Sequence, residues 1–71
     1  MAVKKIMTSE RVYTTVSVQR AERIAEECGV SLVLVEAEVK SGNKYMNDFE
    51  VAGPVGNVEK FLVRLKDVEV L

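Results

Sequence analysis

The stretch from residue 31 to residue 52 constrains the fold most, because it has the pattern of a β-hairpin. Residues 31–40 are rich in valine and leucine. In residues 44–52, successive side chains alternate between two sets, as they do on the two faces of a half-buried strand. Ser41, Gly42 and Asn43 lie between these runs, and glycine and asparagine supply the positive φ angles of a tight reversal. The sequence therefore predicts two antiparallel strands joined at residues 41–43.

The register of this hairpin follows from which side chains share a face. A three-residue loop sets Val35 opposite Phe49 and Val33 opposite Val51, so that one face is consistently apolar. A two-residue loop sets Val35 opposite Glu50 and mixes apolar with acidic side chains. We therefore expect the three-residue loop, with a bulge.

The outer face of the predicted sheet carries both acidic and apolar side chains. The three-residue register places Glu36 opposite Asp48 on this face, and like charges in that position are destabilising unless water reaches them. The same register leaves more apolar side-chain surface on the outer face than a solvated face normally has. We predict an interface there with a second copy or another protein, formed by Tyr13, Leu32, Leu34 and Met46.

Two amphipathic helices flank the hairpin in the sequence. In residues 19–28, Ala21, Ile24, Ala25 and Cys28 recur with helical spacing, and Gly29 is the residue expected just past the helix end. After the break at residues 53–54, a second stripe runs through about residue 66, formed by Val58, Phe61, Leu62 and Leu65.

The two ends of the chain are predicted as strands. Residues 11–18 alternate and are dominated by β-branched side chains, which favours a strand over the alternative of one helix covering residues 9–28. Residues 67–71 alternate again and predict a short final strand. Residues 1–10 are either a leader or contain a short extra strand at residues 3–7.

This order of elements predicts one domain covering residues 1–71, of the α+β class. Right-handed crossovers turn βαββαβ into the ferredoxin-like fold, a four-stranded antiparallel sheet with both helices on one face. The hairpin then contributes its inward side chains to the core, together with both helical stripes. The predicted core residues in the strands are Val12, Val16, Val18, Val33, Val35, Ala37, Val39, Tyr45, Phe49, Val51, Val68 and Val70.

Composition excludes several classes of function. The chain has no histidine, which removes the usual residue of acid–base catalysis and zinc ligation, and Cys28 lies on the predicted buried stripe. We therefore expect no enzyme, no cofactor and no metal. The sequence shows neither a membrane span nor a signal peptide, and a lone cysteine suits a reducing compartment, so we expect a cytoplasmic protein.

The charged residues do not indicate a metal or nucleic-acid site. Glu36, Glu38, Asp48 and Glu50 are spread along two strands without a loop to converge them, which indicates a solvated acidic face. The net charge is −1, and the acids on this face would repel phosphates. Tyr13 is the one aromatic residue expected there, so the sequence does not favour nucleic acid as a partner.

The start of the first helix is the candidate ligand site. A helix N-terminus accepts anions, because its free N–H groups carry partial positive charge. Ser17 would cap the helix, Gln19 would donate a hydrogen bond, and Arg20 would bind a carboxylate or phosphate. The alternative is a capped helix with a surface arginine and no ligand.

Two segments resemble the ACT and NIL type of small regulatory domain. They are residues 25–39 (AEECGVSLVLVEAEV) and residues 48–65 (DFEVAGPVGNVEKFLVRL), where the second matches the phrase V-x-G-x-x-x-x-(V/I)-E-K-x-L-x-x-L. The resemblance covers about residues 11–71. It implies a domain that pairs with a copy of itself and binds an amino acid or similar molecule at the interface. In those families the turn before the first helix contains glycine, whereas residues 18–20 have none.

These observations together predict a small non-catalytic binding or regulatory module that self-associates and binds a small anionic ligand such as an amino acid. The alternative is an interaction subunit that docks on a larger protein through the uncovered sheet face. A nucleic-acid-binding protein is a third alternative.

Overall fold

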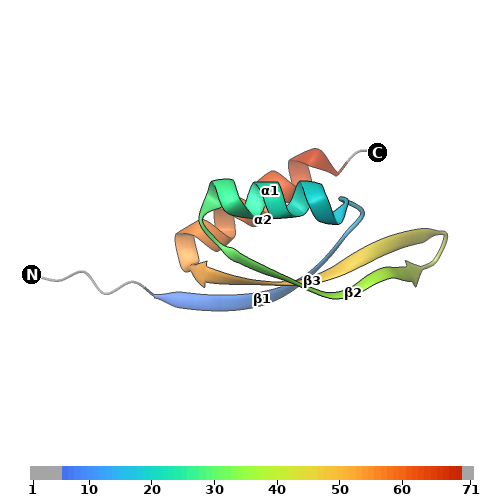
Figure 1. The fold of residues 1–71 in the computed structure, drawn as a ribbon, viewed down its shortest axis with the longest axis horizontal. Helices are drawn as coiled ribbons and strands as arrows, with labels where there is room; N and C mark the ends of the chain where they lie inside the picture. The colour runs from blue at the N-terminus through green and yellow to red at the C-terminus, as the bar shows by residue number, and fades with distance from the viewer. Residues whose placement is uncertain (1–5, 70–71) are drawn as a thin grey trace, which may run out of the picture.

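Five elements make up the fold in the computed structural model, which describes residues 6–69. Two strands form a hairpin, one strand precedes it, and a helix follows the first strand and the last (Figure 1). In chain order they are β1 (Met7–Thr14), α1 (Val18–Cys28), β2 (Ser31–Ser41), β3 (Lys44–Pro54) and α2 (Val55–Val68).

The three strands form one antiparallel sheet in the order β1-β3-β2, and both helices lie on one face of it (Figure 1). The order β-α-β-β-α fits a partial ferredoxin-like fold. The predicted four-stranded sheet is wrong, because Asp67 and Val68 of the expected last strand are the final turn of α2. Val68 packs against the core three residues after Leu65, so it extends the apolar stripe of α2 and favours helix over strand at this position. Residues 70–71 lie outside the described residues.

The first strand begins earlier and ends earlier than predicted. Residues 11–18 were expected in it, yet β1 covers Met7–Thr14, so residues 7–10 are strand as well. The Thr14 hydroxyl accepts a hydrogen bond from the Val16 N–H at 3.1 Å, and this turn takes the chain out of the sheet. Val16 is buried beneath α1 as a loop residue. The alternative of one helix over residues 9–28 is wrong, and residues 3–5 lie outside the described residues.

Helix α1 has the ends and the buried stripe that its sequence predicts. The Ser17 side chain accepts a hydrogen bond from the Arg20 N–H at 3.3 Å and caps the first turn. Gly29 ends the helix with a left-handed φ of 72°, which costs glycine little. The four residues of the stripe are all buried.

The hairpin register differs from the prediction. The loop has two residues, Gly42 and Asn43, and Ser41 pairs with Lys44. Two shifts in β2, between residues 34 and 36 and between residues 36 and 39, each place an extra residue opposite β3.

The two-residue loop decides which side of β2 faces the helices at the start of the strand. Leu32 pairs with Val51 and Leu34 with Phe49, so these leucines share the face of buried β3 residues. The expected inward residue Val33 pairs with Glu50 and is exposed. The expected three-residue loop put these side chains on the opposite face, because a loop one residue longer shifts the pairing by one residue, whereas the two bulges together shift it by two and restore the alternation.

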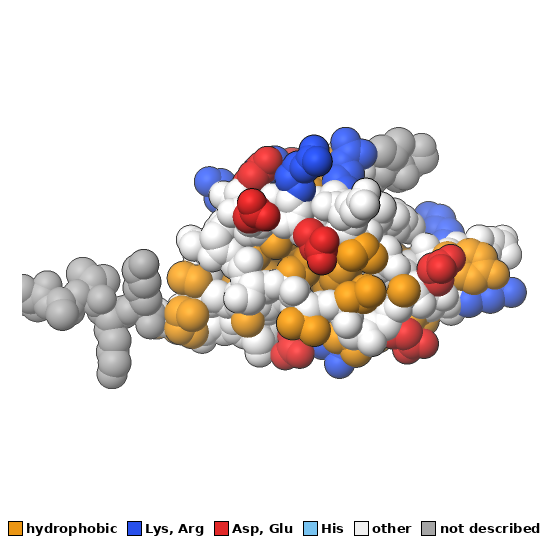
Figure 2. Space-filling view, viewed as in Figure 1, with side chains coloured by type: hydrophobic (Ala, Val, Ile, Leu, Met, Phe, Trp, Pro, Cys, Tyr) orange, Lys and Arg blue, Asp and Glu red, His pale blue; other side chains and the backbone are white. Residues whose placement is uncertain are grey.

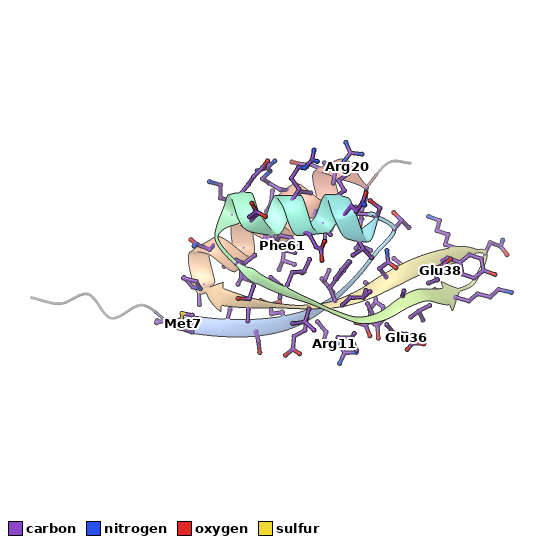
Figure 3. The ribbon with its side chains drawn as sticks, viewed as in Figure 1. Met7, Arg11, Arg20, Glu36, Glu38 and Phe61 are labelled. Carbon is purple, nitrogen blue, oxygen red and sulfur yellow. The ribbon has the colours of Figure 1, made fainter. Side chains whose placement is uncertain are left out.

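The core lies between the sheet and the two helices. Its largest side chains come from β3 and α2, and Figure 3 shows Phe61 between the helix layer and the sheet. Val35, Ala37 and Tyr45, which were predicted in the core, are exposed. Val35 lies at the first bulge, and the hairpin beyond it extends past the helices (Figure 1). Between residues 6 and 69, no helix has the length and apolar character needed to cross a membrane.

Candidate functional site

The sheet face opposite the helices, here called the open face, is covered by neither α1 nor α2. Because Val12 pairs with the buried Phe49, the alternate residues of β1 lie on the open face, namely Met7, Ser9, Arg11 and Tyr13. The same alternation places Met46, Asp48, Glu50 and Ala52 of β3 there. Figure 3 shows the side chains of Arg11 and Glu36 pointing away from the helices.

An ion pair lies at the centre of the open face. Arg11 Nε donates to Asp48 Oδ1 at 3.0 Å, and Arg11 Nη2 contacts Asp48 Oδ2, so the guanidinium holds the carboxylate in a bidentate fork. Asp48 is only 3% exposed, whereas about half of the Arg11 side chain is accessible. The hydrogen bond from Arg11 lowers the pKa of Asp48 against the opposing effect of burial, and Tyr13 adds a smaller lowering.

This ion pair neutralises one member of the acidic cluster that the sequence places on the outer face, where Glu36 lies opposite Asp48 as predicted. Asp48 is paired with Arg11, and Glu38 sits at the second bulge with a φ of 54°. The Glu38 N–H donates to Asn47 Oδ1 at 3.1 Å, and Asn47 Nδ2 donates to the Val16 carbonyl at 3.0 Å. Among residues 6–69, no three acidic, cysteine or histidine side chains come together as a metal site would need.

The open face carries apolar side chains as well as the ion pair and its acidic neighbours Glu36 and Glu50. Met7, Tyr13 and Val33 are each more than half exposed there, and Met46 is half-buried. Soluble chains rarely leave several large apolar side chains uncovered on one face without a binding role. Met7 and Val33 were absent from the predicted interface, and the register shift that exposes Val33 has no signal in the sequence.

The four predicted interface residues divide between the two faces. Tyr13 and Met46 lie on the open face as expected. Leu32 and Leu34 lie on the helix side, so their predicted place on the open face is wrong. Leu34 is exposed at the flank formed by β2, where Figure 2 shows hydrophobic side chains at the surface below α1.

The predicted ligand residues come together at the start of α1. Ser17, Gln19 and Arg20 line one shallow hollow of about 290 Å³, and Arg23 from the next turn completes it. The first turn of α1 has no acidic residue to offset its partial positive charge. Sequence reasoning missed Arg23, although its i, i+3 spacing from Arg20 puts both on one helical face.

Comparisons of the chain with protein-family models, with curated proteins and with solved structures found no match.

Proposed function

We propose that this chain is a non-catalytic binding module that self-associates face to face through the open face. The observation that carries the proposal is the exposure of Met7, Tyr13 and Val33 on a sheet face that neither α1 nor α2 covers. A chain of 71 residues buries a small core, and covering this face with a second copy would add apolar burial that the monomer lacks.

The charges of the open face favour a second copy as the partner. Arg11 lies directly opposite Glu50 in the β1–β3 register, and Glu50 has no ion pair among the described residues. A two-fold axis passing between these side chains would set Arg11 of each copy against Glu50 of the other. Such a self-complementary pairing is what an isologous dimer requires.

Sedimentation velocity on two variants tests this proposal. Val33→Glu introduces a charge on the open face, and Val63→Glu makes the same change on α2, where the side chain is similarly exposed (59% and 61%). We expect a dimer for the parent chain and for Val63→Glu, and a monomer for Val33→Glu. A parent chain that stays monomeric while folded would refute self-association and leave a larger protein as the partner of this face.

A second candidate function is supported by the hollow at the start of α1. Arg20 and Arg23 have no ion pair among the described residues, and they lie beside the uncompensated helix N-terminus. A small carboxylate or phosphate is the ligand that this charge pattern favours.

Thermal unfolding with single amino acids and with inorganic phosphate tests the second candidate. A ligand of the folded state raises Tm in a concentration-dependent way, and Arg20→Ala should abolish the rise. Arg64→Ala, which removes an arginine paired with Glu27 on the other helix, is the control that should keep it. An unchanged Tm across the panel would count against this site.

A further inference from the structure

Strand β1 is a regular edge strand whose outer backbone groups can pair with another strand. Its register with β3 runs through all eight residues without a shift, and no other described residue pairs with its outer side. The Ile6 carbonyl accepts from the Val55 N–H at 2.9 Å, while Pro54, which has no N–H, faces Met7. Since bonded and non-bonded pairs alternate, the N–H and C=O groups that point outward belong to Met7, Ser9, Arg11 and Tyr13.

The other edge of the sheet is built differently. Strand β2 carries two bulges, and Glu38 at the second has a positive φ of 54° held by its bond to Asn47. Bulges bend an edge strand and interrupt its ladder, which opposes the addition of another strand. The regular edge of β1 has no such protection, so it is the edge that favours strand addition.

Helix α2 lies over this edge and leaves space beneath it. This hollow has a volume of about 260 Å³ and is lined by Val12 and Tyr13 of β1, by Leu62, Leu65 and Lys66 of α2, and by Glu69 just after α2. Val12 and Leu62 are half-buried members of the core that reach this hollow. A strand added outside β1 would place alternate side chains against them.

We propose that β1 accepts an extended segment of a partner protein as a fourth, antiparallel strand beneath α2. The outward backbone groups specify a β-strand as the occupant, and alternate side chains give the selectivity. The residue opposite Val12 is aliphatic, because it enters the hollow beside Leu62. The residue opposite Glu10 is basic, because Glu10 is exposed and has no ion pair among the described residues.

A second copy of this chain does not fit the edge in the same sheet. A two-fold axis that pairs β1 with the same strand of another copy keeps the helices of both on one face, and both α2 helices would then overhang the shared edge. A segment without a helix over its own strand avoids this overlap. The edge site uses the outward backbone groups of β1 and shares Tyr13 with the open face, and its test at the backbone amides is distinct from the test of the face-to-face dimer.

Amide exchange followed by NMR on the full chain tests the edge site. The probe is a synthetic peptide as long as β1, with alternating threonine and valine and one lysine placed to meet Glu10. We expect the amides of Ser9, Arg11 and Tyr13 to exchange at least about tenfold more slowly with the peptide. A control peptide with proline at its centre should give no protection.

Two variants check that the edge carries this effect. Ser9→Pro removes one outward N–H and should abolish peptide protection, whereas Ser9→Ala keeps that N–H and should retain it. Leu62→Glu places a charge in the hollow and should also abolish protection without changing the β1 backbone. Circular dichroism shows whether each variant is folded.

Three results would overturn the proposal. The first is a lack of protection at millimolar peptide, and the second is protection that Ser9→Pro and Leu62→Glu both retain. The third is slow exchange of the outward β1 amides without peptide in a sample that sedimentation shows to be dimeric, which would assign the edge to a second copy.

Discussion

Substituting Leu32 and Val33 separately by threonine tests the bulged register of β2. In the structure, Leu32 is half-buried against the core and Val33 is exposed on the open face. Leu32→Thr removes part of a leucine burial worth about 1.5–3 kcal/mol and brings a hydroxyl to the core margin, so we expect a loss of about 1–2 kcal/mol. Val33→Thr keeps a β-branched side chain in water, so its effect on the free energy of unfolding should stay within about 0.5 kcal/mol.

Urea unfolding followed by circular dichroism measures both changes, at a dilution where sedimentation shows the chain to be monomeric. At about 4–8 °C per kcal/mol for a domain of this size, Leu32→Thr should also lower Tm by about 4–16 °C. The three-residue-loop register expected from the sequence predicts the reverse order, because it sets Val33 opposite Val51 and leaves Leu32 on the outer face. A larger loss for Val33→Thr than for Leu32→Thr would therefore refute the bulged register.

Three further predictions concern the core and the polar contacts. Phe61→Ala removes a fully buried ring and should lower the free energy of unfolding by about 3–5 kcal/mol, which a thermal melt would show as a large fall in Tm. Because Arg11 lowers the pKa of Asp48, this carboxylate stabilises the fold above its ordinary pKa, and that stability is lost as pH falls through the lowered pKa. The unfolding free energies of the parent and Asp48→Asn should therefore approach each other as pH falls below about 4. Asn47→Asp replaces the donor to the Val16 carbonyl and should cost about 1–3 kcal/mol in urea at neutral pH, whereas an unchanged midpoint would show that this bond is unimportant.

Local signals in the sequence predicted the helices well. The stripe from Ala21 to Cys28 and the glycine at residue 29 gave α1 within one residue, since Val18 is its first residue. The break at Gly53 and Pro54 likewise placed the start of α2. These features depend on residues within a few positions of one another, so a single sequence contains them.

The strands were harder to predict because their register depends on tertiary contacts. The second β2 bulge is held by Asn47, which bonds both Glu38 and the Val16 carbonyl, and nothing in the local sequence of β2 encodes this contact. The end of β1 depends on the bond between Thr14 and Val16, which competes with strand continuation. Each of these contacts moved an alternating pattern from one face or element to another.

The candidate sites follow the same division. Ser17, Gln19 and Arg20 lie together because they are consecutive or one turn apart, so local sequence sufficed. The open face draws on strands far apart in the chain, and the sequence therefore gave Tyr13 and Met46 but misplaced Leu32 and Leu34. The sequence did not distinguish the regular edge of β1 from the bulged edge of β2, because the positions of the bulges depend on tertiary contacts.

Isotope-filtered NMR on a mixture of labelled and unlabelled chains tests self-association through the open face most directly. The account predicts intermolecular contacts between the Val33 methyl groups and open-face side chains of the second copy, among them the Tyr13 ring. Val63 on α2 should show none. Intermolecular contacts at Val63 without any at Val33, or a folded sample without intermolecular contacts, would contradict it.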